Sequence, residues 1–122
     1  MTLREAITAA DALINNEFTD EEKICFISEL DGLVFRNIIE PHEGGQAHFV
    51  PYDATTPPET ELLIGDPYAT AYVLWIQSKA DYFYGEAERY NNSAARFLDA
   101  YNAFSADYNQ RHRSKKKRLK FW

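Results

Sequence analysis

The side chains with the strongest chemical character in this sequence are seven basic residues near the C-terminus. Residues 111–120 contain all seven and no acid, whereas all 19 acidic residues lie within residues 1–107 beside six basic ones. The formal charge is therefore −13 over residues 1–107 and +7 over residues 111–120. So dense a positive segment cannot pack internally, and it must meet water, phosphate or an acidic protein surface.

The end of this basic segment favours a protein partner. Leu119, Phe121 and Trp122 are apolar and compatible with a strand, so we expect residues 113–122 to form an extended tail that docks on a neighbouring protein. The residues predicted to anchor the chain in this way are Arg113, Lys115, Lys116, Lys117, Arg118, Lys120, Phe121 and Trp122. A tail that binds nucleic-acid phosphate and a tail that is only solvated are the alternatives.

Groups that could bind a metal or act as a nucleophile lack the necessary pattern. His42, Glu43 and His48 lie in a stretch with Gly and Pro, where no helical register aims two imidazoles at one point. Cys25 stands in an apolar run and is interpreted as a small buried hydrophobe. The sequence therefore predicts neither a metal site nor a reactive thiol.

Signatures of catalysis are also missing from the sequence. Most carboxylates fall at helix starts or outward-facing positions, where capping and solubility explain them. The chain has no phosphate-binding glycine loop, no dinucleotide fingerprint and no nucleophile elbow. We therefore predict a protein that is not an enzyme and needs no cofactor.

The elements that must position the basic segment are predicted to be helices. Thr2 with Glu5, and Thr19 with Glu22, form capping boxes that predict helix starts. Apolar residues at three- and four-residue steps extend these helices over residues 2–14 and 19–38. The second helix has two apolar flanks, which is typical of a helix that is central or shared between subunits.

Two further helices are predicted in the second half of the chain. Asp66 and Pro67 predict a helix start that leads to residue 88, and Ser93 caps a helix over residues 93–111. The short link between them favours antiparallel packing. Aromatic side chains at helical spacing form the predicted scaffold core, namely Tyr68, Tyr72, Trp75, Phe83, Phe97, Tyr101 and Phe104.

Residues 40–65 are predicted to be a long connection, because glycine and proline rule out a continuous helix there. Extended pieces over residues 47–52 and 61–64 allow a short β-hairpin. A connection of this length is more often functional than idle. We therefore interpret it as an inter-subunit or gating loop, with Pro41, Gly44, Gly45, Phe49, Tyr52, Pro57 and Pro58 as its characteristic residues.

The expected fold is all-α, with one compact four-helix domain over residues 1–112 followed by the tail over residues 113–122. No stretch approaches the roughly 18 consecutive apolar residues that cross a bilayer. The N-terminus does not have the pattern of a secretory signal. We therefore expect no membrane partner, and a chain made in a reducing cytoplasm.

Several short stretches, taken in combination, suggest a family. They are TDEEK at residues 19–23, ELDG at 29–32, LLIGDPY at 62–68 and YNNSA at 90–94. Over about residues 1–110 the chain resembles the small neck proteins of tailed bacteriophages, which are called head-tail connectors, adaptors or head-completion proteins.

This resemblance implies a helical structural subunit in the neck of the virion. Such a subunit would form a homo-oligomeric ring of twelve copies beneath the portal protein and offer a platform to tail-side neck proteins. Double-stranded DNA would pass through the ring without sequence-specific binding. The alternative from another class is a small regulatory protein that binds nucleic acid through its basic tail.

Overall fold

A computed structural model describes the backbone of residues 1–43 and 48–120 and the side chains of residues 1–42 and 48–112. The chain is mainly helical, as predicted, and the described residues contain no strand longer than one bridge. Its elements are α1 (Leu3–Leu13), α2 (Asp20–Val34), the π-helix η1 (Phe35–Ile39), α3 (Glu40–Glu43), α4 (Thr70–Phe83) and α5 (Ala87–Lys120). No helix in the described part is long and apolar enough to cross a membrane.

The first two helices begin at the predicted capping boxes. The Thr2 amide donates to Glu5 Oε1 at 2.8 Å, and the Glu5 amide donates to Thr2 Oγ1 at 3.2 Å. Thr19 and Glu22 repeat this exchange at 2.9 and 3.1 Å. Each box satisfies backbone donors that a helix start leaves free, so the local sequence alone sets these two boundaries.

The second helix runs further than predicted. α2 passes without a break through η1 into α3, so Pro41 lies in a helix and not in the loop. Directly before it, the Glu40 amide donates to the Phe35 carbonyl in the wider turn of a π-helix. A proline clashes with the carbonyl four residues back in a regular helix, and the wider turn gives the ring room.

The start of α4 was predicted too early. Asp66 and Pro67 lie in turns, and the helix begins at Thr70 with no side-chain cap. Ala69, Ala71 and Tyr72 are buried there. Packing of this first turn into the core, and not a cap in the sequence, therefore sets the boundary.

The break between the last two helices lies at Gly85, and the predicted break at residues 91–93 is wrong. The Glu86 amide donates to the Asp81 carbonyl at 2.9 Å and the Gly85 amide to the Tyr82 carbonyl at 3.2 Å, which together form a Schellman motif. Gly85 has a φ of 71°, a conformation that favours glycine. Ser93 therefore lies inside α5 and caps nothing.

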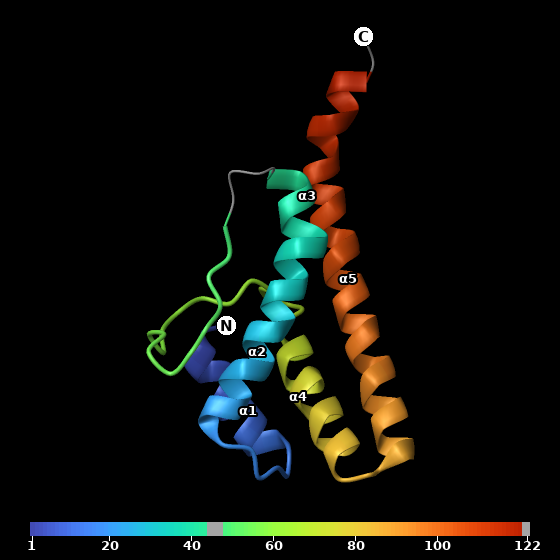
Figure 1. The fold of residues 1–122 in the computed structure, drawn as a ribbon. Helices are drawn as coiled ribbons and strands as arrows, with labels where there is room; N and C mark the ends of the chain where they lie inside the picture. The colour runs from blue at the N-terminus through green and yellow to red at the C-terminus, as the bar shows by residue number, and fades with distance from the viewer. Residues whose placement is uncertain (44–47, 121–122) are drawn as a thin grey trace.

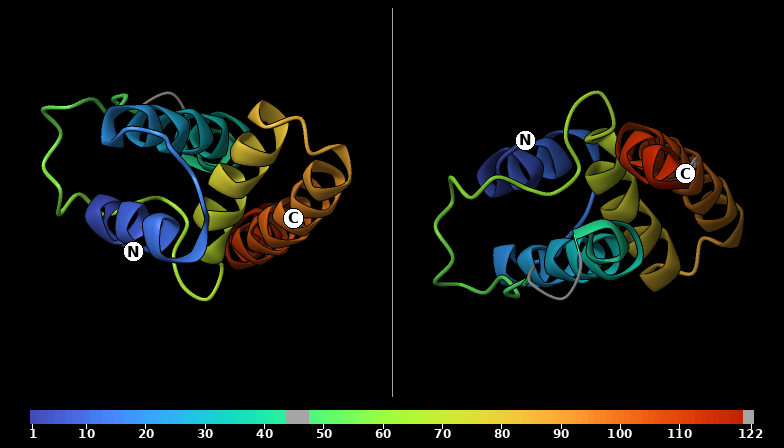
Figure 2. Two further views of the ribbon diagram at one scale, coloured as in Figure 1. Left: turned by 90° about the horizontal axis from the view of Figure 1, so that it is seen from below. Right: turned by 90° about the horizontal axis from the view of Figure 1, so that it is seen from above.

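The helices form three layers, with α4 in the middle. Figure 2 shows α1 and α2 on one side of α4 and α5 on the other. The core between them is formed by apolar side chains that include Leu3, Ala6, Ile27, Leu30, Val34, Tyr72 and Ile76. α4 and α5 run antiparallel, as predicted (Figure 1).

The C-terminal segment does not form the predicted extended tail. Its backbone continues α5 to Lys120 without a break at residue 112. The 34 residues of α5 span about 51 Å, and the helix extends beyond the end of α3 in Figure 1. Phe121 and Trp122, the apolar end of the predicted anchor, lie outside the described residues, as do the side chains of residues 113–120.

Candidate functional site

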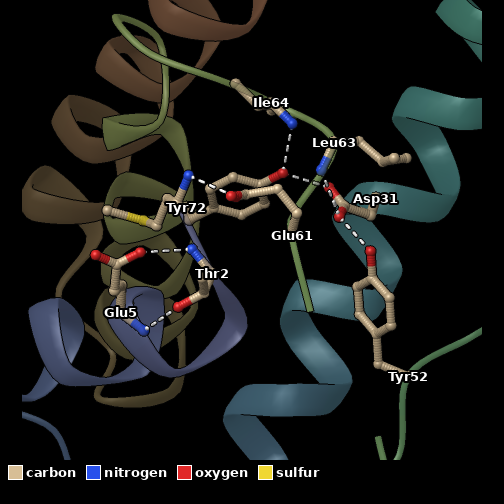
Figure 3. Close-up of polar contacts among 9 residues, drawn as sticks. Thr2, Glu5, Asp31, Tyr52, Glu61, Leu63, Ile64 and Tyr72 are labelled. Atoms are coloured by element: carbon tan, nitrogen blue, oxygen red, sulfur yellow. Dashed lines mark hydrogen bonds and ion pairs between the residues drawn. The ribbon is translucent and has the colours of Figure 1, made fainter. Parts of the chain in front are cut away.

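The predicted loop is fixed to the helices by one buried carboxylate. Asp31 of α2 has no exposed surface. Its Oδ1 accepts a hydrogen bond from the Tyr72 hydroxyl at 2.6 Å, and its Oδ2 accepts from the Tyr52 hydroxyl at 2.7 Å and the Leu63 amide at 3.1 Å. Figure 3 shows these donors converging on Asp31 from the loop and from α4. One side chain therefore joins two helices and two points of the loop.

The electrostatics of this network follow from burial. Burial raises the pKa of the Asp31 carboxyl, and the hydrogen bonds from Tyr72, Tyr52 and Leu63 offset part of the rise. Burial and the adjacent carboxylate raise the pKa of both the Tyr52 and Tyr72 hydroxyls. The two phenols therefore remain donors at neutral pH. Tyr72 also accepts from the Ile64 amide at 2.7 Å, so its hydroxyl is fully used in holding the chain.

The far end of the loop is held by the N-terminus, and not by the predicted hairpin. Glu61 pairs with Thr2 in an isolated antiparallel bridge, and the Leu62 amide donates to the Met1 carbonyl at 3.0 Å. The Met1 amino group also contacts the Glu61 carboxylate at 3.0 Å (Figure 3). In the described part of residues 47–52 there is no strand.

The loop residues singled out from the sequence have different surroundings. Phe49 stacks on Phe35 with ring centroids 6.0 Å apart and contacts Tyr52 edge-on at 5.4 Å. Pro57 and Pro58 are exposed, and the Pro58 carbonyl accepts from the Arg4 amide at 2.9 Å. Gly44 and Gly45 lie outside the described residues. The structure thus brings Phe49 and Tyr52 together and leaves the two prolines apart from them.

An open groove of about 760 Å³ lies between α2 and residues 48–52. Its lining includes Cys25, Leu33, Arg36, His48 and Phe49. Cys25 is exposed, which contradicts the prediction of a buried thiol. It lies two residues before buried Ile27, about 200° around the helix, and therefore faces away from the core.

His42 takes part in a contact between helices. Its Nε2 lies 2.7 Å from Asn109 Oδ1, and its ring meets that of Tyr108 edge-on at 5.4 Å. His112 lies against Tyr108 with ring centroids 3.9 Å apart. These rings join α3 to α5 where the basic segment begins. Among the described residues, no group of three or more His, Cys, Asp and Glu side chains could hold a metal ion.

Most of the predicted aromatic scaffold lies between the helices. Tyr72, Phe97 and Phe104 are buried, while Tyr68, Trp75 and Tyr101 are partly buried against them. Ring contacts join Trp75 to Phe97 at 4.9 Å and Tyr68 to Phe104 at 6.0 Å. Both pairs connect α4, or the turn before it, to α5.

Phe83 is the exception, because it is 62% exposed. It lies in the last turn of α4, directly before the turn at Gly85. Tyr82, Tyr84 and Tyr90 surround this turn and are 68%, 48% and 38% exposed. We call Tyr82, Phe83, Tyr84 and Tyr90 the aromatic end. The aromatic end was not predicted from the sequence, although a glycine after an apolar helical run is the signal that could have located the turn.

The aromatic end adjoins the link between α1 and α2. The rings of Phe18 and Phe83 meet edge-on at 5.8 Å, and the Glu17 amide donates to the Tyr84 hydroxyl at 3.0 Å. The α1–α2 connection and the α4–α5 turn both lie at the lower end of the molecule in Figure 1, opposite the basic segment. The aromatic end thus lies at the opposite end of the molecule from the backbone of the basic segment.

Comparisons with protein-family models, curated proteins and solved structures find no match to this chain. The resemblance to phage neck proteins therefore depends on the short stretches given above.

Proposed function

We propose that this chain is a structural subunit of a head-tail connector ring in a tailed bacteriophage. The observation that carries the proposal is the aromatic end, where four large aromatic side chains are exposed around one turn and Tyr82 contacts both Phe83 and Tyr90. Exposed clusters of aromatic side chains often mark interaction sites, because protein interfaces are enriched in Tyr and Phe. A subunit that meets other subunits has a use for such a surface.

The two ends of the molecule also suit a ring. A closed ring needs a heterologous interface, in which one patch of a subunit meets a different patch of the next. The aromatic end and the basic segment are two such patches. The loop over residues 48–65, which is tied to Asp31 and the N-terminus, would serve as a fixed contact between subunits, because its attachments leave little freedom for gating.

The negative charge of residues 1–107 is compatible with a channel through which DNA passes. Residues 1–107 carry a formal charge of −13, and a channel lined with negative charge would repel the phosphates of the duplex. In this proposal the ring sits in the virion neck, joins the portal protein to tail-side neck proteins and contains twelve copies, as the resemblance implies. The proposal assigns the chain no catalytic role and no cofactor.

Electron microscopy tests this function directly. The purified chain, alone or with the portal protein of the same phage, should give rings with a central opening, and antibody labelling should place the chain in the necks of virions. A chain that stays monomeric with and without portal protein, and is missing from particle necks, would refute the proposal. Neighbouring genes for portal, capsid and tail proteins would support it at little effort.

A nucleic-acid-binding regulator is the second candidate, and the course of α5 favours it. The helix carries six basic residues beyond residue 112, in the part that extends past the end of α3. With the seven basic residues of 111–120 on phosphates, the logarithm of the DNA affinity would fall against the logarithm of salt concentration with a slope of about −6. An affinity for duplex DNA that does not depend on salt would remove this candidate.

A further inference from the structure

The turn between α4 and α5 contains a hollow beside the aromatic end. Its volume is about 330 Å³, and its lining is Asp81, Tyr82, Gly85, Glu86, Ala87, Tyr90 and Asn91. The rings of Tyr82 and Tyr90 stand 5.7 Å apart at 60° to each other. Glu86 is exposed beside them. The hollow is therefore mainly apolar, with two aromatic rings and the exposed Glu86 among its lining residues.

The second carboxylate in the lining is already engaged. Asp81 is buried, its Oδ2 lies 2.8 Å from the Ser93 hydroxyl, and its Oδ1 accepts from the Gln77 amide group at 3.2 Å. The contact with Ser93 joins the first turns of α5 to α4, and the contact with Gln77 lies within α4. Glu86 is therefore the acidic lining residue whose carboxylate stays open to solvent at the hollow.

This combination selects for a cationic side chain. An ammonium or guanidinium group is attracted to the face of an aromatic ring, and its aliphatic stem covers apolar surface. A carboxylate at the edge of the ring adds a charge-assisted hydrogen bond. The surroundings are negative as well. The exposed acidic residues at this end are Glu17, Glu86 and Glu88, whereas Arg89 is an exposed basic one. Lysine or arginine is the side chain that fits.

The same chain carries these side chains at its other end, but cannot bring them to its own hollow. Tyr90 and Lys116 both belong to α5, and their separation of 26 positions along the helix holds them about 39 Å apart. The helix is continuous, so the basic segment cannot fold back onto the turn. A basic segment that enters the hollow must come from a second copy.

We infer that the basic segment of one copy, residues 111–120, places a lysine or arginine side chain against the rings of Tyr82 and Tyr90 and beside Glu86 of the next copy. The inference rests on the proposed assembly function and names the contact by which copies join. The contact is heterologous, so it repeats from copy to copy and closes into a ring where the rotation between neighbours allows it.

Two full-length variants test this contact by complementation. The hollow variant carries Tyr82→Ser and Glu86→Gln, and the segment variant carries Lys115→Glu, Lys116→Glu and Lys117→Glu. The hollow variant keeps an intact basic segment, and the segment variant keeps an intact hollow, so the two together can form one contact. Sedimentation should show that each alone associates at least tenfold more weakly than the wild type. An equimolar mixture should form a one-to-one pair that grows no further.

A matched control carries Asp99→Asn and Leu98→Ser, which make the same kinds of change at exposed positions of α5 away from the hollow. It should associate as the wild type does. Circular dichroism should show the same helix content for all variants, which removes misfolding as an explanation.

The remaining outcomes overturn the inference. Variants that form the same rings as the wild type would refute this contact and leave the connector proposal standing. A wild type that does not self-associate, variants that do not complement each other, or association that needs added DNA would also refute it. Complementing variants of a chain that is missing from virion necks would refute the connector function and leave the contact standing.

Discussion

Asp31 shows at the scale of a single residue how this fold depends on a polar group. Its carboxylate is the common acceptor for Tyr52, Leu63 and Tyr72, which lie far from it in the sequence. A buried donor that loses its acceptor carries the full cost of its lost hydration. The stability of the loop should therefore respond sharply to changes at this one position.

We expect Asp31→Ala to lower the free energy of unfolding by about 3 kcal/mol, because two hydroxyls and one amide lose their acceptor in the interior. Asp31→Asn keeps the shape and one acceptor oxygen, and should cost about 1 kcal/mol. Urea denaturation measures both values. Asp99→Ala, at an exposed position on α5, is the control and should stay within about 0.5 kcal/mol of the wild type. An Asp31→Ala effect as small as that of the control would show that the network does not hold the loop.

The same network predicts how stability changes at high pH. Tyr52 and Tyr72 have pKa values raised above the ordinary 10.0, so above pH 10 the unfolded chain loses protons that the folded chain keeps. The free energy of unfolding then falls as pH rises, by up to about 1.4 kcal/mol per pH unit for each group. Lys23 acts in the same direction: burial lowers its pKa, but Asp11 and Asp20 outweigh burial and raise it overall.

Urea midpoints measured from pH 8 upward should therefore fall most steeply above pH 10. A smaller fall should begin near pH 8, because the contact with Glu61 raises the pKa of the Met1 amino group above 8.0. Tyr52→Phe should make the fall above pH 10 less steep, because one of the two phenols is gone. Tyr82→Phe removes a phenol that is 68% exposed and should leave the slope unchanged. Equal slopes for the wild type and Tyr52→Phe would contradict the assignment.

Local sequence cannot reveal a residue such as Asp31. It stands between Glu29 and Gly32 in a stretch of charged and apolar residues, and nothing near it in the sequence marks it as buried. Its partners are 21, 32 and 41 residues away. Only the folded chain brings them together, whereas a capping box is complete within four residues and was predicted correctly twice.

At the scale of the elements, one glycine shows why a predicted helix boundary was wrong. Gly85 ends α4 in a left-handed conformation, whereas the sequence analysis placed the break at Asn91, Asn92 and Ser93. Those three residues favour turns in isolation, but inside α5 the Ser93 hydroxyl contacts Asp81 and is buried. Tertiary packing thus outweighed the local turn preference of residues 91–93. At Gly85 the positive φ favours a residue without a Cβ atom, so the turn forms there.

We expect Gly85→Ala to destabilise the chain by about 1 kcal/mol, because a side chain in the left-handed region costs this much even where there is space around it. Gly65→Ala is a matched control, since Gly65 also has nothing within 4 Å of an added Cβ but no positive φ. That change should be neutral or should stabilise the chain by up to about 1 kcal/mol, because alanine lowers the conformational entropy of the unfolded chain. Thermal denaturation of the two variants side by side measures the difference, and equal effects would argue against a strained turn.

At the scale of the whole molecule, the uneven distribution of charge predicts how assembly depends on salt. The attraction between the basic segment of one copy and the carboxylates at the aromatic end of the next acts between exposed groups, which salt screens. Apolar contact between two aromatic ends, the competing arrangement, would be unaffected or strengthened by salt. The two arrangements therefore differ in the sign of a measurable slope.

We expect the self-association constant to fall roughly tenfold or more between about 0.05 M and 0.5 M sodium chloride, as the screening length shortens from over 10 Å to under 8 Å. Sedimentation equilibrium at several salt concentrations measures this slope. The segment variant should lose most of the dependence, because the positive charges that salt screens are gone. Association that strengthens with salt would mean that the aromatic ends meet each other, and that the basic segment serves a different partner.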